Sequence, residues 1–183
     1  MNRRWLWLLI LFLAGDALLM LWWWRSHLEH RYDNVIRSAA ARYQLPPALV
    51  KAVIWRESRF QPHARGRAGE LGLMQLTETA AQEWADATHR RRFVHADTLS
   101  PVINTEAGCY YLSKILKRYT QTDRPFVFAL ADYNAGRGNV LRWMKGPAST
   151  NSTAFLTQMD FPGTREYIRA ILERHDHYRT EFR

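Results

Sequence analysis

A long apolar run near the N-terminus constrains the fold more than any other feature of this 183-residue chain. It extends from Trp5 to Trp24 and is interrupted only by Gly15 and Asp16. Twenty such residues in a helix are long enough to cross the hydrocarbon core of a bilayer. Arginines precede the run and three tryptophans end it, as in the aromatic belt of a membrane interface. We therefore expect residues 1–24 to form a membrane anchor.

The alternative interpretation of this run is a cleaved signal peptide. A signal peptide has a shorter apolar core followed by a cleavage site of small residues. Here the run ends in Trp22-Trp23-Trp24-Arg25, and no such site follows, so we favour an uncleaved anchor. Basic residues concentrate before the run, whereas the charges after it offset one another (Arg3 and Arg4 before; Arg25, Arg31, Glu29 and Asp33 after). The positive-inside rule then places the remainder outside the cytoplasm.

The remainder reads as a linker, residues 25–34, and one domain, residues 35–183. Without residues 1–24 it carries 24 basic and 16 acidic side chains, a net charge of +8. Basic domains bind nucleic acid, anionic lipid or anionic wall polymer, and composition alone does not choose among these or a plainly solvated surface. The single cysteine, Cys109, excludes an intramolecular disulfide and a cysteine metal cluster, and we expect it to be a packing residue.

Apolar residues in this domain recur at helical spacing, and no segment shows a convincing strand pattern. Helices are expected over 32–43, 47–57, 77–84, 100–119, 125–134 and 140–144, and from Thr164, as its N-cap, onward. Segments 58–74, 86–99 and 148–153 are rich in Gly, Pro or polar residues and are expected to be loops. The sequence therefore predicts an all-α domain behind one N-terminal transmembrane helix.

Glu57 is the residue whose position conflicts with its chemistry. Val50, Val53 and Ile54 occupy i, i+3 and i+4 of one helix face, and Glu57 takes the i+7 position. A carboxyl group buried there has a raised pKa, because burial disfavours its charged form. A carboxylic acid that stays protonated near pH 7 can act as a general acid. The alternative is a helix-end glutamate that faces solvent or pairs with a neighbouring arginine.

Several further blocks follow Glu57 in order. They are Glu57-Ser58-Arg59-Phe60, Ala64, Ala68-Gly69, Gly72-Leu73-Met74-Gln75, Asn104, Tyr111-Leu112, Ala131-Asp132-Tyr133-Asn134-Ala135-Gly136, Gly138-Asn139-Val140 and Thr164-Arg165-Glu166-Tyr167-Ile168. Together they resemble the SLT-type lytic transglycosylases, family 23 of the glycoside hydrolases, which are related to goose-type lysozyme. The resemblance covers about residues 35 to 178, and it favours the catalytic interpretation of Glu57.

The resemblance implies a lysozyme-like all-α fold that cleaves peptidoglycan between N-acetylmuramic acid and N-acetylglucosamine. It also implies that Glu57 alone acts as acid and then as base, with formation of a 1,6-anhydro product. Most glycosidases use two carboxylates. Three further carboxylates are candidates for the second one, Glu70, Glu78 and Asp132, but none of them has sequence neighbours that would give it a catalytic role.

The resemblance also assigns the walls of a substrate-binding cleft. Met74 and Gln75 match the cleft lining, and Tyr133 and Asn134 match a tyrosine–asparagine pair on the opposite wall. Tyr167 matches a tyrosine that faces the catalytic glutamate. Plain core packing is the alternative for Met74, Tyr133 and Tyr167.

The chain departs from the family pattern at several positions near this cleft. Gly66 stands where serine is common, and Glu70 replaces a small residue and could add negative charge to the cleft. Thr77-Glu78 replaces methionine-proline, and Gly163 replaces a frequent glutamate. These departures indicate a divergent member that keeps the catalytic group.

No cofactor or metal is expected. His175 and His177 are two residues apart on an expected helix, so their side chains point in different directions. Gly136-x-Gly138 lacks the third glycine of a dinucleotide fingerprint.

The sequence thus predicts a lytic transglycosylase held in the inner membrane by a single span, with its catalytic domain in the periplasm. Its expected partners are peptidoglycan glycan strands and the membrane, not nucleic acid. Two alternatives remain open: a hydrolytic muramidase that uses Glu57 with water, and a non-catalytic wall-binding scaffold. The small size modestly favours opening the wall for a secretion or conjugation assembly over general wall turnover.

Overall fold

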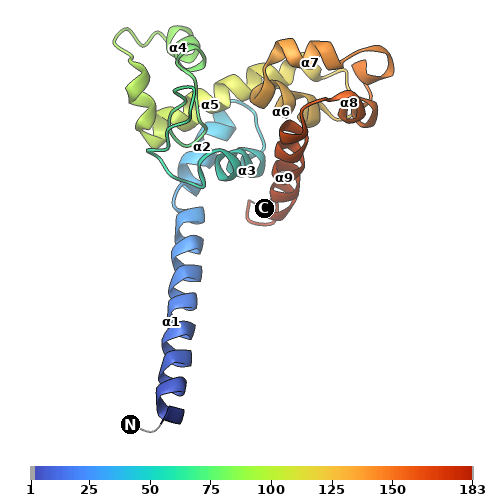
Figure 1. Cartoon of the computed structure of the whole chain (residues 1–183). Coiled ribbons are helices and arrows are strands. Elements are labelled where there is room, and N and C mark those ends of the chain that lie inside the picture. Colours follow the sequence, from blue (N-terminus) through green and yellow to red (C-terminus); the bar gives the residue numbers. More distant parts are fainter. Residues whose placement is uncertain (1–2, 183) are drawn as a thin grey trace.

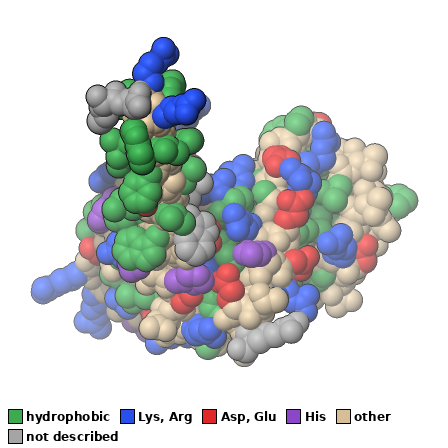
Figure 2. Space-filling model, turned by 90° about the horizontal axis from the view of Figure 1, so that it is seen from below, with side chains coloured by type: hydrophobic (Ala, Val, Ile, Leu, Met, Phe, Trp, Pro, Cys, Tyr) green, Lys and Arg blue, Asp and Glu red, His purple; other side chains and the backbone are tan. Residues whose placement is uncertain are grey.

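One long helix projects from a cluster of shorter helices in the computed structural model, which describes residues 3–182 except for the side chains of Trp22 and Arg25 (Figure 1). This helix, α1 (Arg3–His30), is long and apolar enough to cross a membrane. No part of its most apolar stretch is buried against the rest of the protein. Figure 2 shows apolar side chains covering it, with basic side chains at its free end. Of the expected aromatic belt, Trp23 and Trp24 are exposed, whereas Trp22 and Arg25 lie outside the described side chains.

The other helices form the domain. They are α2 (Asp33–Arg42), α3 (Pro47–Ser58), α4 (Glu78–Ala87), α5 (Pro101–Leu116), α6 (Pro125–Ala135), α7 (Arg137–Trp143), α8 (Ser152–Gln158) and α9 (Pro162–Tyr178), with 3-10 turns at His95–Leu99, Lys117–Tyr119 and Gly146–Ser149. The residues from 3 to 182 form no sheet, and only two isolated bridges occur, Arg65 with Leu71 and Leu71 with Leu76. The prediction of an all-α domain behind one long apolar helix is therefore confirmed.

Helix α3 lies at the centre of the domain and positions the site. Pro46 precedes it in an extended conformation, and Pro47 at its first position has no backbone N–H that the helix would need. All residues from Ala48 to Ile54 are buried, because α3 packs most extensively against α9 and also against α2. The C-terminal end of α3, which carries Glu57, is consequently held between two other helices of the domain.

Two local predictions fail for identifiable reasons. The first residues of helix α8 belong to segment 148–153, which was expected to be a polar loop. The Asn151 side chain caps this helix by accepting the Ala154 N–H at 2.9 Å, and Phe155 within it is fully buried. Helix α9 begins at Pro162, so Thr164 lies in its first turn and is not its N-cap. The Thr164 hydroxyl instead donates to Asn134 at 2.8 Å, since a proline at the first position had already fixed the start of the helix.

A buried lysine of α3 joins the start of the domain to the C-terminal residues. The Lys51 side chain has no exposed surface, and its Nζ lies 2.6 Å from Glu181 Oε2, 2.8 Å from Asp33 Oδ1 and 3.3 Å from His30 Nδ1. His30, Asp33 and Glu181 lie close enough together to hold a metal ion, but the lysine ammonium already supplies the positive charge there. This charged cluster ties the end of α1 and the start of α2 to the C-terminal residues.

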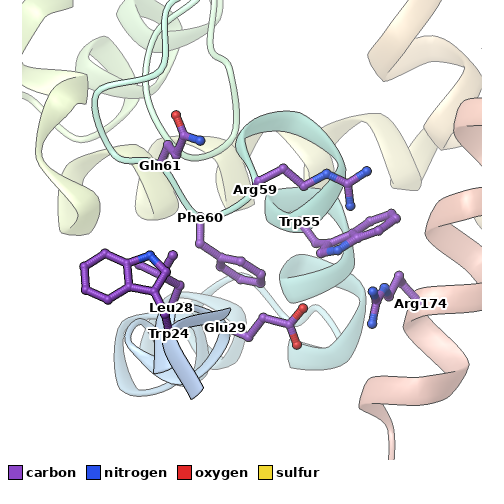
Figure 3. Close-up of a pocket in the computed structure, with 8 residues that line it drawn as sticks. All are labelled: Trp24, Leu28, Glu29, Trp55, Arg59, Phe60, Gln61 and Arg174. Atoms are coloured by element: carbon purple, nitrogen blue, oxygen red, sulfur yellow. The ribbon is translucent and has the colours of Figure 1, made fainter. Parts of the chain in front are cut away.

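A second contact between α1 and the domain surrounds a pocket of about 580 Å³ (Figure 3). Trp24 and Leu28 of α1 line one side of it. On the other side the Trp55 ring lies between two guanidinium groups, 3.6 Å from that of Arg59 and 4.5 Å from that of Arg174. The Trp55 ring joins α3 to Arg174 of α9 beside this pocket, and the charged cluster ties the end of α1 to α3.

Candidate active site

Glu57 lies in the last turn of α3, where the chain turns away sharply. The Ser58 hydroxyl donates to the Ile54 carbonyl at 3.2 Å, closing the end of the helix as expected for a residue of the fold. Arg59 and Phe60 both have positive φ, 52° and 62°, a left-handed conformation that residues other than glycine adopt rarely. This turn ends α3 directly after Glu57 and leaves the carboxyl group half-buried at the helix end.

Tyr167 of α9 holds the Glu57 carboxyl group. Its hydroxyl donates to Glu57 Oε1 at 2.6 Å across 110 residues of sequence, and only 2% of its side chain is exposed. The packing of α3 on α9 brings the pair together. The Tyr167 ring is thus buried in the core, while its hydroxyl contacts the Glu57 carboxyl group, so the two interpretations of this residue are compatible.

The environment of Glu57 shifts its pKa upward. Burial is the largest cause and raises the pKa of Glu57 from 4.5 to about 7, against the opposing effects of the Tyr167 hydrogen bond and of Arg56. The carboxylate of Glu70 adds a smaller upward effect. A group with this pKa has comparable protonated and ionised populations near neutral pH, so it can donate a proton and later accept one.

The loop between α3 and α4 folds back on itself beside Glu57. The Gly66 N–H donates to the Glu70 carbonyl at 2.8 Å, and the Gly72 N–H donates to the Ala64 carbonyl at 2.9 Å. Leu71 and Leu76 exchange two backbone hydrogen bonds, both of 3.0 Å. These bonds satisfy the backbone of a compact loop that contains no helix or sheet, and they fix the position of Gln75.

Asn104 of α5 fixes this loop through side-chain hydrogen bonds to its backbone, a role that the sequence did not reveal. Its fully buried amide accepts the Met74 N–H at 2.7 Å and donates to the carbonyls of Leu71 and Thr98, both at 2.8 Å. Gly72 has φ +79°, and a Cβ there would lie 2.2 Å from Asn104 Nδ2. Glycine is therefore required at position 72, and a buried amide within an apolar helix was the signal that could have identified Asn104.

Met74 and Gln75 follow this glycine but face different surroundings. The Met74 side chain has no exposed surface and packs on α5 at Gly108, so core packing describes it. Gln75 has φ 47°, and its amide nitrogen donates to the carbonyls of Ala64 and Gly72 at 3.1 and 2.9 Å. The Gln75 amide oxygen lies beside Gly66, 2.9 Å from the position that a Cβ on Gly66 would take.

Tyr133 and Asn134 stand at the end of α6. The Tyr133 hydroxyl donates to the Met74 carbonyl at 2.7 Å, which joins α6 to the Gln75 loop. Asn134 is exposed, and its side-chain oxygen accepts the Thr164 hydroxyl. Among the described residues nothing bonds the Asn134 amide nitrogen, which can therefore donate to a ligand.

The other candidate carboxylates have different positions. Asp132 is buried and bonded to Arg118 at 2.9 Å and to the Tyr119 hydroxyl at 2.7 Å, a structural ion pair. Glu78 is exposed in the first turn of α4. Of these candidates only Glu70 acts on the pKa of Glu57.

Comparison with known proteins identifies the family of this domain. The sequence model of the transglycosylase SLT domain matches residues 34–156. A membrane-bound lytic murein transglycosylase F of Desulfosudis oleivorans is 37% identical over 113 residues, which are 60% of this chain and 23% of that protein. A soluble lytic murein transglycosylase of Escherichia coli is 28% identical over 166 residues, 84% of this chain and 24% of that protein.

Solved structures show the same fold. The lytic transglycosylase Slt of Pseudomonas aeruginosa, in the form of an inactive mutant, superposes with a TM-score of 0.75 at 25% identity, over 83% of this chain and 24% of that one. The chain spans about a quarter of the length of these relatives. Since the family model covers most of the helical domain, the chain belongs to the transglycosylase SLT domain family.

Proposed function

We propose that this chain is a peptidoglycan lytic transglycosylase, which cleaves the bond between N-acetylmuramic acid and N-acetylglucosamine and leaves 1,6-anhydro ends. The observation that carries the proposal is the Glu57–Tyr167 pair, a half-buried carboxyl group with its pKa near 7 and a single oriented hydrogen bond. The names of the relatives, lytic murein transglycosylases, support the same reaction class.

In the proposed reaction Glu57 transfers its proton to the glycosidic oxygen as the bond from that oxygen to the muramoyl C1 breaks. The muramoyl 6-hydroxyl attacks C1, its oxygen forms the new bond, and its proton passes to the Glu57 carboxylate. No water is consumed and Glu57 ends protonated, as it began. The Tyr167 hydroxyl stabilises the ionised carboxylate between the two transfers, because hydrogen bonds to charged groups are the stronger ones.

The remaining predicted residues would bind the glycan in this proposal. The Gln75 oxygen and the Asn134 amide nitrogen offer an acceptor and a donor to sugar hydroxyl and N-acetyl groups. Tyr133 and Met74 act indirectly, because the Tyr133 hydroxyl and the Met74 carbonyl bond to each other and fix the cleft walls.

Mass analysis of products tests the reaction. The full chain in detergent is incubated with peptidoglycan sacculi, and anhydro-muramoyl ends are expected. Reducing ends would instead identify a hydrolytic muramidase that uses Glu57 with water. We expect Glu57→Gln to fold normally and to lose nearly all turnover, since an amide cannot donate the proton. Wild-type-like turnover in that variant would contradict the mechanism, and a wild-type chain that binds sacculi without cleaving them would indicate a scaffold.

We also propose that residues 1–24 anchor the chain in the inner membrane, with the domain of residues 35–183 in the periplasm. The exposed apolar surface of α1 supports a membrane span, and the arginines before it support this orientation. Membrane fractionation with N-terminal sequencing tests the anchor. The intact N-terminus is expected in the membrane fraction, and a soluble form that begins near Ser26 would overturn it.

A further inference from the structure

Glu70 replaces a small residue of the family pattern, and its side chain lies over Gly66. Its Oε2 accepts the Ala68 N–H at 3.1 Å and lies 2.1 Å from the position of a Cβ on Gly66. That distance is shorter than any real contact of a Cβ. The two departures from the family pattern are therefore linked, because the Glu70 carboxylate occupies the space of a side chain at position 66.

A second oxygen converges on the same place. The Gln75 amide oxygen lies 2.9 Å from the same Cβ position over Gly66. Its orientation is fixed, because the Gln75 amide nitrogen donates to the carbonyls of Ala64 and Gly72. An ionised carboxylate and an amide oxygen both only accept hydrogen bonds, so this place suits a donor from a ligand.

The chain itself satisfies this pair of acceptors poorly. Among the described residues, the Ala68 N–H is the one hydrogen-bond partner of the Glu70 carboxylate, and no ion pair neutralises it. Glu70 is half-buried and lies near enough to raise the pKa of Glu57, whose other charged or titratable neighbours are Arg56, Tyr167 and Tyr133. A carboxylate with a single backbone donor retains acceptor capacity for a ligand.

We propose that Glu70 is a specificity-determining residue, which together with the Gln75 oxygen accepts a hydrogen bond from a hydroxyl or amide N–H of the bound glycan over Gly66. The proposal rests on the proposed function, because it assigns a contact within the same cleft. The negative charge of Glu70 excludes a carboxylate of the substrate from this place and strengthens a hydrogen bond from a neutral donor. Glycine at position 66 leaves room for the Glu70 carboxylate that accepts this bond.

The first test measures KM and kcat of the full chain on sacculi. A hydrogen bond to a charged group contributes about 1.5–3 kcal/mol, so Glu70→Ala should raise KM about tenfold or more while the melting temperature changes little. Glu70→Gln keeps an acceptor without the charge, so its KM should lie between those of the wild type and Glu70→Ala. Glu70→Gln should also lower the apparent pKa of the alkaline limb of the kcat profile, where Glu57 loses its proton, since one carboxylate that raises the pKa of Glu57 is removed. Glu78→Gln, in the exposed first turn of α4, is the matched control and should change neither.

A second test uses the link between positions 66 and 70. Gly66→Ser should displace the Glu70 carboxylate and raise KM on its own. In the Glu70→Ala background the same serine should fit and should restore part of the lost affinity through its hydroxyl. Additive effects of the two substitutions on KM would contradict the shared space.

The outcomes separate this proposal from the proposed function. If the wild-type chain cleaves sacculi but Glu70→Ala leaves KM and the pH profile unchanged, the Glu70 proposal fails alone. If the wild-type chain does not cleave them, its affinity for sacculi is measured by sedimentation. Equal affinity of wild type and Glu70→Ala would then overturn the Glu70 proposal as well, whereas at least a tenfold loss would support it.

Discussion

Replacing Glu57 by glutamine should stabilise the domain at neutral and alkaline pH. Glutamine keeps the shape of the side chain and an oxygen that can accept the Tyr167 hydrogen bond, but it has no charge to bury. In the wild type the carboxyl group must either ionise in a half-buried place or keep a proton that the unfolded chain would release. The chemistry of the site therefore costs folding stability, and the pKa of Glu57 gives the amount.

The magnitude and sign follow from proton linkage. The pKa of Glu57 rises from 4.5 in the unfolded chain to about 7 in the fold, and each pKa unit corresponds to about 1.4 kcal/mol. Between these two values the folded state holds one proton more than the unfolded state, so the free energy of unfolding falls as pH rises. The loss begins near pH 4.5, is complete above pH 7, and amounts to about 3 kcal/mol.

Thermal unfolding of both proteins across pH 4 to 9 measures this effect. The difference between Glu57→Gln and wild type cancels the contributions of all other titrating groups. A domain of this size shifts its melting temperature by about 2–4 °C per kcal/mol, so the variant should gain about 6–12 °C between pH 4 and pH 8. A difference that stays constant over this range would refute the burial argument, and with it the basis for Glu57 as a general acid.

Two further perturbations address the neighbours of this site. Tyr167→Phe removes only the hydroxyl that donates to Glu57 at 2.6 Å. Turnover of sacculi should fall about ten- to a hundredfold, because a hydrogen bond of about 1.5–3 kcal/mol is lost. The melting temperature should change little. Lys51→Met leaves the carboxylates of Asp33 and Glu181 without their buried partner; the free energy of unfolding, measured with denaturant, should fall by about 3–5 kcal/mol.

Matched variants control for both results. Tyr110→Phe removes a surface hydroxyl that bonds Glu83 at 3.4 Å and should leave turnover unchanged. Lys114→Met breaks a half-exposed ion pair with Glu83 and should cost less than about 1 kcal/mol. If Tyr167→Phe unfolds the domain with specific activity intact, Tyr167 is a core residue only. If Lys51→Met costs no more than Lys114→Met, the charged cluster does not hold the fold together.

The sequence predicted those parts of the site that depend on local patterns. An apolar helix face with a carboxylate at i+7 drew attention to Glu57, because periodicity reports which side of a helix is buried. The family resemblance was needed to favour its catalytic interpretation over a glutamate that faces solvent. The contact with Tyr167 depends instead on how α3 packs on α9, and only the family resemblance anticipated it. The role of Asn104 was missed, since its hydrogen bonds reach a loop about 30 residues earlier.

The fold shows the same division between local and tertiary signals. Helices with proline starts, such as α5 and α6, were placed within a few residues, because proline fixes the backbone at the first helical position. Helix α8 was missed because its sequence is polar, and burial of Phe155 against the other helices stabilises it. The burial of Lys51 could not be read from its sequence neighbours either, since its partners come from α2 and the C-terminal residues.

Helix α1 continues without a break from the apolar run to His30. The six residues after Trp24 add about 9 Å of helix at 1.5 Å per residue, and the Lys51 cluster fastens that end to the domain. On the proposed anchoring, the domain therefore stands on a short, stiff stalk and not on a flexible tether. Its search for glycan strands becomes a diffusion in two dimensions, and only strands within one domain diameter of the bilayer come within its reach.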